Sequence, residues 1–306
     1  MRLRMWGTRG SIPAPGPETV RYGGNTSCVE VSNGEPDHRL ILDAGTGIRH
    51  LGNTFGADCP ARLDILLTHL HSDHIMGMGF FDPLWNPEQE IHIWGPASAT
   101  RTLAERMARY LSPPFFPVRM NEIPSKLSFH DVPEDEFEVG GFRVKAERIV
   151  HQGPTVGYRL IGDGASVAYL PDHEPALAGI DSVKHPEWIS GYRLAKGVDL
   201  LLHDAQYSDT EYPQRRGWGH SSISHVVSYA QVCEVRRVMM FHHEPRHSDE
   251  ELEALRETGL RQWERTHAAE DLMLAAEGVQ VDVEGSGIAF GEFDSSAPHA
   301  VADATG

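Results

Sequence analysis

Cysteine is scarce in this sequence, and its few copies lie far apart. The 306 residues include Cys28, Cys59 and Cys233, and no two of them form a CxxC pair. An odd and sparse set of cysteines fits free thiols in a reducing compartment better than a disulfide framework. We therefore expect free thiols and a cytoplasmic protein.

Long apolar runs are also absent. No stretch of about eighteen consecutive apolar residues occurs, so we expect no membrane-spanning helix. The first residues, 1–16, carry basic side chains but no apolar segment as long as a signal peptide needs. A membrane is therefore not expected as a partner.

Positive charge is in the minority. Lysine and arginine total 27 against 44 aspartate and glutamate residues, which gives a formal net charge of −17. Proteins that grip long nucleic acids carry a basic surface, and this composition argues against one. The same charge argues only weakly against a small anionic substrate.

What the sequence does contain is enough apolar material for a large core. With 306 residues, of which 40% are hydrophobic, an undivided α/β domain is expected. We predict one domain over residues 1–293. Residues 294–306 are rich in Ser, Ala, Pro and Gly, and we predict a flexible C-terminal tail there.

Apolar runs and turn residues predict the order of the elements. Strands are expected at Leu3–Trp6, Ser27–Ser32, Leu40–Asp43, Leu63–Thr68, Ile91–Trp94, Phe142–Val150, Val156–Ile161, Ser166–Leu170, Asp199–His203, Arg237–Phe241 and Val279–Val283. Helices are expected at Ile48–Phe55, Ala99–Leu111, Ile223–Cys233 and Asp249–Ala276. Gly162-Asp163-Gly164 suits a hairpin turn. Strands in both halves, each half with helices, predict two sheets packed between helical layers.

The sharpest local pattern is Thr68-His69-Leu70-His71-Ser72-Asp73-His74, directly after a predicted buried strand. Imidazole suits zinc and similar first-row metals, and a carboxylate adds charge. Four ligands at such close spacing cannot all reach one ion without distortion. Two adjacent divalent ions are therefore the simplest expectation.

Further ligand types follow other predicted strands. His151, Asp172 and His242 each come directly or almost directly after an apolar run. A single histidine at a strand end is more often a structural hydrogen-bonding residue. A repeated pattern at the edges of parallel or mixed sheets instead indicates ligands that converge from several strands.

These motifs resemble the metallo-β-lactamase superfamily, because THLHSDH is similar to its HxHxDH signature. The resemblance extends from Gly7 to about Pro245. It is strongest to the phosphodiesterase branch, which contains tRNA 3′-processing endonucleases, a cyclic phosphodiesterase of the phosphonate pathway and cyclic-nucleotide phosphodiesterases. The other segments that carry it are His151–Arg159, Tyr169–Asp172, Leu201–Ala205, Gly219–Ser222 and Met240–Pro245. It implies the α/β fold of a four-layer αββα sandwich.

The resemblance also implies a set of metal ligands. These are His69, His71 and His151 on one ion, Asp73, His74 and His242 on the other, and Asp172 as a bridge between the two. His243 competes with His242, which is preferred because Pro245 then falls at the matching spacing. His173 replaces the small hydroxyl residue common after the bridging aspartate, and we expect a packed imidazole there.

The implied reaction is hydrolysis of a phosphodiester by a hydroxide that bridges the two ions. Zinc is the expected metal, with manganese or iron as alternatives. Asp73 is expected to orient the hydroxide, and His220 is the candidate general acid for the leaving alkoxide. Asp204 is expected to support a metal-bound histidine. Arg215 and Arg216 are candidate phosphate contacts, although exposed loop arginines are the commoner case.

A small, cyclic phosphodiester such as a cyclic nucleotide is the predicted substrate. The tRNA endonucleases of the superfamily typically carry a long arm between the third-histidine and bridging-aspartate motifs, where this chain has only Gln152–Pro171. The alternatives are an endoribonuclease acting on tRNA 3′ ends, a lactonase or a thioesterase. A metal- or nucleotide-binding protein with a degenerate site is the non-enzymatic alternative, and the complete ligand set argues against it.

The loop Ser112–Pro117 combines prolines with Phe115 and Phe116. Covering the site, stacking on a base, packing against a second subunit and filling the core are all compatible with this composition. A homodimer is one of the expectations that follow.

Overall fold

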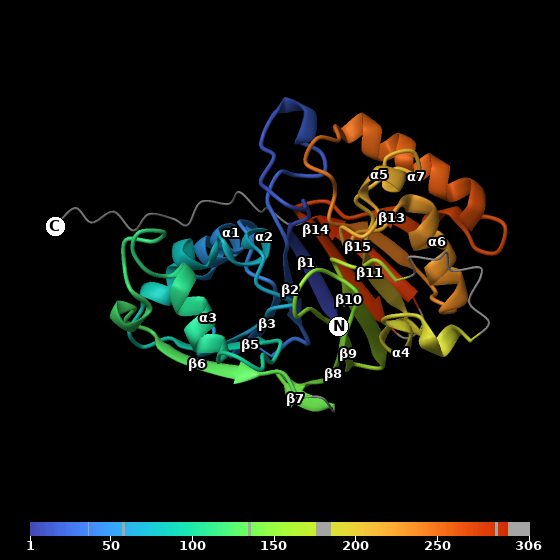
Figure 1. The fold of residues 1–306 in the computed structure, drawn as a ribbon. Helices are drawn as coiled ribbons and strands as arrows, with labels where there is room; N and C mark the ends of the chain where they lie inside the picture. Colours follow the sequence, from blue (N-terminus) through green and yellow to red (C-terminus); the bar gives the residue numbers. More distant parts are fainter. Residues whose placement is uncertain (36, 57–58, 134–135, 176–184, 285–286, 293–306) are drawn as a thin grey trace.

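The structure is a computed structural model in which residues 1–35, 37–56, 59–133, 136–175, 185–284 and 287–292 are described. The predicted flexible tail, 294–306, lies outside the described residues. Two β-sheets form the centre of the molecule, and helices lie on their outer sides (Figure 1).

The first sheet has eight strands in the order β15-β14-β1-β2-β3-β4-β5-β6. Its strands are β1 (Arg2–Gly7), β2 (Cys28–Ser32), β3 (His38–Leu42), β4 (Arg62–Leu66), β5 (Glu90–Gly95), β6 (Lys126–Asp131), β14 (Val279–Glu284) and β15 (Gly287–Glu292). The four strands from β3 to β6 are parallel to one another. Central parallel strands are covered on both faces, which explains why every residue of β4 after Arg62 is buried, including Asp64.

The second sheet has seven strands in the order β13-β12-β11-β10-β9-β8-β7. Its strands are β7 (Phe137–Val139), β8 (Phe142–Arg148), β9 (Val156–Gly162), β10 (Ala165–Leu170), β11 (Leu200–Asp204), β12 (Val238–Phe241) and β13 (Leu272–Leu274). The predicted hairpin joins β9 to β10. Its two turn residues, Asp163 and Gly164, have φ values of 53° and 71°, the positive values that a tight hairpin turn of this kind needs.

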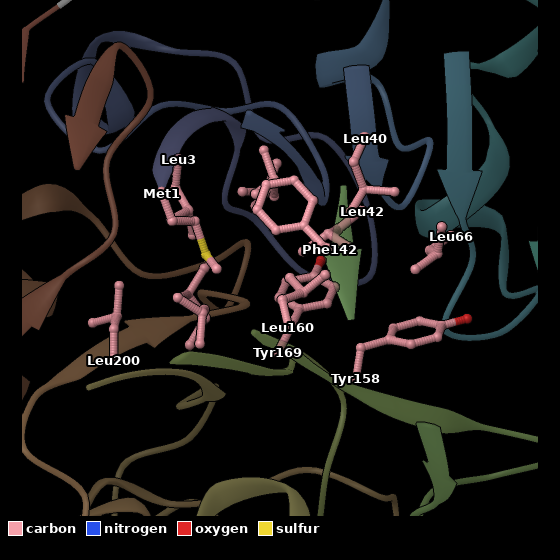
Figure 2. Packing of buried hydrophobic residues seen from close by; sticks show 14 of the residues in the cluster. Met1, Leu3, Leu40, Leu42, Leu66, Phe142, Tyr158, Leu160, Tyr169 and Leu200 are labelled. Atoms are coloured by element: carbon pink, nitrogen blue, oxygen red, sulfur yellow. The ribbon is translucent and has the colours of Figure 1, made fainter. Parts of the chain in front are cut away.

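An apolar layer fills the space between the two sheets (Figure 2). The side chains labelled there are Leu3, Leu40, Leu42 and Leu66 from the first sheet, Met1 just before its strand β1, and Phe142, Tyr158, Leu160, Tyr169 and Leu200 from the second sheet. Each large apolar side chain buried in this way contributes about 1.5–3 kcal/mol relative to an exposed one. Their alternation along the strands fixes which face of each sheet points inward.

Helices bury the outer face of each sheet. Helices α1 (Gly47–Phe55) and α3 (Leu103–Tyr110) pack on the first sheet, and α4 (Tyr192–Ala195), α6 (Ile223–Val232) and α7 (Asp249–Trp263) pack on the second. The short helices α2 (Ser72–Ile75) and α5 (Tyr212–Arg215) lie in loops beyond the strand ends. The order helix, sheet, sheet, helix confirms the predicted four-layer αββα fold (Figure 1).

Helix α3 begins later than the predicted Ala99–Leu111. The hydroxyl of Thr102 accepts a hydrogen bond from the Glu105 amide, and the Glu105 carboxylate accepts one from the Thr102 amide. This reciprocal cap satisfies free amide groups at the start of the helix. The cap therefore sets the first helical residue at Leu103.

The predicted helix Asp249–Ala276 is wrong in its second half. Helix α7 ends at Trp263, and Leu272–Leu274 forms β13, which pairs in parallel with β12. The sequence also does not predict β6, β7 or β15. Together with β13 these are the four edge strands of the two sheets. Edge strands are short or only partly buried, so their apolar pattern is weak.

Two further expectations concern the whole chain. No helix within the described ranges is long and apolar enough to cross a membrane. Cys28, Cys59 and Cys233 are free thiols, as expected, and Cys28 and Cys233 are buried.

Candidate metal centre

The predicted ligands come from loops at one edge of the two-sheet sandwich. Strands β8, β10, β11 and β12 run in the same direction, so their carboxyl ends share one edge of the second sheet. The segment His69–His74 follows β4 of the first sheet and meets this edge. All seven predicted ligands are thereby brought together in space.

The seven side chains form two clusters that share one residue. The first cluster is His69, His71, His151 and Asp172, and the second cluster is Asp73, His74, Asp172 and His242. Within each cluster the ligand atoms all lie within 4.8 Å of one another. The division between the clusters is the one that the resemblance implied.

Asp172 stands between the clusters. Its Oδ2 lies 3.4 Å from His151 Nε2 and 3.6 Å from His69 Nε2 in the first cluster. Its Oδ1 lies 2.9 Å from His74 Nε2 and 3.2 Å from His242 Nε2 in the second. Each oxygen of one carboxylate therefore faces a different cluster, as a bridge between two ions requires.

The remaining contacts have similar lengths. In the first cluster His71 Nδ1 lies 3.1 Å from His151 Nε2. In the second, Asp73 Oδ2 lies 3.1 Å from His242 Nε2 and 3.4 Å from His74 Nε2. Ligands about 2.1 Å from a tetrahedral zinc ion stand about 3.4 Å apart. These separations match that spacing.

Two buried polar atoms support the same interpretation. Within the described residues, neither His69 Nε2 nor Asp172 Oδ1 makes a hydrogen bond of good geometry, although Asp172 Oδ1 lies 2.9 Å from His74 Nε2. An unpaired polar atom in a protein interior is costly, so such atoms in a native fold call for an explanation. A bound cation supplies one, because imidazole nitrogen and carboxylate oxygen are both metal ligands. The residues fit a dinuclear metal site.

Burial and neighbouring charges shift the pKa values of histidines in both clusters. Burial lowers the pKa of His69, His71 and His151, which favours the neutral imidazole that binds metals. Burial also lowers the pKa of His74, but the charges of nearby carboxylates outweigh it and raise that pKa well above its usual value. The second cluster therefore attracts positive charge.

Asp43 is a functional candidate that sequence reasoning missed. Its Oδ2 lies 2.8 Å from His74 Nδ1 and accepts a hydrogen bond from the Tyr169 hydroxyl at 3.0 Å. Its Oδ1 accepts one from the Thr68 amide at 2.8 Å. A carboxylate on the far nitrogen of a ligand histidine fixes the tautomer and the ring orientation. Asp43 comes directly after β3, as Asp172 comes two residues after β10, and that position was the available signal.

Of the two adjacent histidines, His242 faces the second cluster and His243 points away. His243 Nε2 lies 2.8 Å from the carbonyl oxygen of Ala275, and burial lowers its pKa to about 3. His242 has a φ of 58°, a left-handed conformation that is rare for a residue with a side chain. The loop residue Gly10 packs directly against its ring.

Gly10→Ala is expected to weaken metal binding at least tenfold, because a Cβ at this position would overlap the ring of His242. Zinc affinity measured by competition with a chromophoric chelator would test this. Gly16→Ala in the same loop is the matched control, since a Cβ there meets nothing within 4 Å. Equal zinc affinities of the two variants would contradict the role of Gly10.

His220 lies beside both clusters. Its ring centroid is 5.0 Å from those of His151 and His242. Its Nδ1 lies 2.6 Å from Asp204 Oδ2. Burial lowers the pKa of His220, but the charge and hydrogen bond of Asp204 outweigh it and raise that pKa to about 9. Asp204 was expected to support a metal-bound histidine. Its carboxylate instead contacts His220, because β11 places Asp204 opposite the Gly219–Ser222 loop.

Other predicted residues take simpler roles. The ring of His173 is fully buried and lies 3.0 Å from both His203 Nε2 and Ser190 Oγ, so it is a packed imidazole as expected. Arg215 pairs with Glu211 at 3.2 Å, and Arg216 is exposed. Neither arginine contacts a residue of the two clusters within the described chain.

The two aromatic residues of the loop Ser112–Pro117 differ in burial. Phe116 is buried and its ring lies 6.0 Å from that of Phe80 and 6.4 Å from that of Trp85. Phe115 is 80% exposed. Phe116 therefore fills the core, and Phe115 is available for a contact outside the chain.

Comparisons with known proteins agree with this geometry. A family model described as Beta-lactamase superfamily domain matches residues 38–243. Ribonuclease Z of Thermoplasma acidophilum is 21% identical, over 93% of this chain and 99% of that protein. Among solved structures, the short form of human tRNase Z superposes with a TM-score of 0.63 at 21% identity, over 92% of this chain and 99% of that one. A diphosphatase of the PhnP family superposes with a TM-score of 0.62 at 19% identity, over 92% and 98%.

Proposed function

The chain belongs to the β-lactamase superfamily domain family, and from this premise we propose that it is a phosphodiesterase that holds two divalent metal ions. The predicted resemblance to the superfamily and to its phosphodiesterase branch is confirmed at the level of the family, as is the expectation of a metal-dependent hydrolase. The observation that supports two ions is the position of Asp172, whose two oxygens face different clusters.

The proposed ligands are the residues of the two clusters. His69, His71 and His151 hold one ion, Asp73, His74 and His242 hold the other, and Asp172 contacts both. Zinc is the proposed metal because five of the seven ligands are imidazoles. When bound, two such ions lower the pKa of a shared water and stabilise charge on a phosphoryl oxygen.

Side chains at the clusters orient the attacking water and donate a proton to the leaving alkoxide. The Asp73 carboxylate is fixed by the Ser11 amide, which donates to its Oδ2 at 2.7 Å, and it can orient the attacking water. His220 donates a proton from Nε2 to the leaving alkoxide, while its Nδ1 faces Asp204. A carboxylate in that position stabilises the protonated ring and holds it in place.

A small cyclic phosphodiester is the proposed substrate. Between His151 and Asp172 the chain forms only the β9–β10 hairpin with its two-residue turn, which leaves no arm for a large RNA. The net charge of −17 supports the same choice. Cleavage of tRNA 3′ ends is the second candidate, because the relative from Thermoplasma acidophilum is named Ribonuclease Z.

A substrate panel tests the choice. Protein reconstituted separately with zinc, manganese and iron is assayed against cyclic AMP, cyclic GMP, 2′,3′-cyclic mononucleotides, a pre-tRNA and a lactone. We expect selective turnover of a cyclic phosphodiester, highest with zinc. Selective cleavage of the pre-tRNA would establish the second candidate, and selective opening of the lactone would reject phosphodiesters altogether. A dimer and a cytoplasmic location stay predictions.

A further inference from the structure

Glu174 lies where three loops of the metal centre meet. It is two residues beyond Asp172, and its backbone amide donates a hydrogen bond to the carbonyl oxygen of Val150, the residue before His151. Its side chain points into the protein, and the whole residue is 2% exposed. No part of the proposed reaction uses this carboxylate.

The buried Glu174 carboxylate is fully occupied by hydrogen bonds. The Gly219 amide donates to Oε2 at 2.8 Å, and the Gly217 amide donates to Oε1 at 2.9 Å and to Oε2 at 3.1 Å. The Tyr212 hydroxyl donates to Oε1 at 2.6 Å. Donors to an ionised carboxylate make strong bonds, and they compensate for its burial.

The segment that Glu174 holds, Gly217–Gly219, is in contact with the first cluster. The carbonyl oxygen of Gly219 lies 2.8 Å from His151 Nδ1, and that of Gly217 accepts a hydrogen bond from Gln152 Nε2 at 2.6 Å. His220 is the next residue along the chain. The position of this segment therefore sets both the ring of His151 and the start of the His220 loop.

The segment has a conformation that needs such support. Gly217 and Gly219 have φ values of 86° and 93°, in the left-handed region. A Cβ at Gly219 would overlap the ring of His151. Glycine at these positions loses much conformational entropy on folding, and the amide bonds to Glu174 offset that loss.

We propose that Glu174 is a positioning residue, whose buried carboxylate fixes Gly217–Gly219 so that the Gly219 carbonyl orients His151 and His220 faces the reacting groups. The proposal rests on the proposed function for its effect on turnover, and on the hydrogen bonds alone for its effect on the loop. Glu174 itself is not one of the proposed ligands.

The test compares Glu174→Ala, Glu174→Gln and Tyr212→Phe. The alanine variant loses every acceptor, and the glutamine variant keeps one oxygen for the glycine amides while its NH2 group can donate to Tyr212. Tyr212→Phe is the matched control, because it removes one donor to Glu174 and leaves both glycine amides paired. Melting temperatures identify a variant that fails to fold, and Glu174→Gln then carries the test.

Three measurements are made on the full chain. Hydrogen exchange followed by mass spectrometry should be faster in the peptide spanning 213–222 of Glu174→Ala and unchanged in distant peptides. Zinc affinity should fall about 10–100-fold, as for other groups that orient ligand histidines. On a phosphodiester that the wild type cleaves, kcat should fall by a similar factor with little change in KM. Glu174→Gln should lie between, and Tyr212→Phe near wild type.

Wild-type exchange in 213–222 together with unchanged zinc affinity in Glu174→Ala would overturn the proposal. A drop in melting temperature with faster exchange throughout the chain in both Glu174→Ala and Glu174→Gln would also overturn it, because that result describes general loss of stability. If the wild type cleaves no phosphodiester, the proposed function fails, whereas exchange and zinc affinity still decide the role of Glu174.

Discussion

Replacing Asp172 by alanine is expected to abolish hydrolysis together with stable binding of the metal pair. Its two oxygens are the contacts that reach both clusters, at 2.9–3.6 Å from four histidines. Without it, the imidazoles of the first cluster have no anionic partner in their ligand set. Stabilisation by a paired metal site amounts to several kcal/mol, so turnover should fall by about 10³-fold or more.

Metal content by mass spectrometry should drop from two zinc ions per chain to one or none in Asp172→Ala. Asp131→Ala is the matched control, because Asp131 is an aspartate at the end of a strand that is exposed and lies outside both clusters. It should keep both ions and full turnover. An Asp172→Ala protein that holds two ions at wild-type affinity would refute the bridging role.

The convergence of the seven proposed ligands was predictable because their signals are local. His69–His74 follow one buried strand within six residues, and His151, Asp172 and His242 each follow another. Strand ends are set by apolar patterning, and parallel strands bring their carboxyl ends to one edge. Local patterns therefore indicate which residues converge, and the resemblance to the superfamily divides them between two ions, without knowledge of how the strands pair.

The contacts that hold the proposed ligands and His220 in place depend on tertiary structure that no local pattern contains. Asp43 reaches His74 because β3 and β4 are neighbours in one sheet, and Asp204 reaches His220 across a loop. Glu174 is similar, since its three donors lie 38 to 45 residues along the chain. Contacts of this kind, between residues far apart in the sequence, can be identified only when the fold is known.

The same limit applies to the edges of the sheets. Residues Leu272–Leu274 follow a long charged helix, and three apolar residues carry no period of their own. Their strand conformation comes from pairing with β12, whose other side is already paired with β11. A helix prediction that extends to Ala276 fails for this reason.

His220→Ala should keep both zinc ions while turnover of an unactivated diester falls by roughly 10²-fold or more. The proposed ligand set does not include His220, so metal content should equal that of wild type. The loss arises because the leaving alkoxide is a strong base that needs a proton, and the imidazole beside Asp204 is placed to supply it.

A comparison of substrates with different leaving groups distinguishes a general acid from a structural residue. A nitrophenolate departs without protonation, so a diester with that leaving group should be cleaved by His220→Ala at close to the wild-type rate. The exposed His185, which pairs with Glu187 at 3.2 Å, gives the control variant His185→Ala, with wild-type rates on both substrates expected. Equal losses on both diesters in His220→Ala, or loss of a zinc ion, would mean that His220 supports the metal centre instead of protonating the product. Proton donation by His220 therefore requires both results, two retained ions and a loss confined to the basic leaving group.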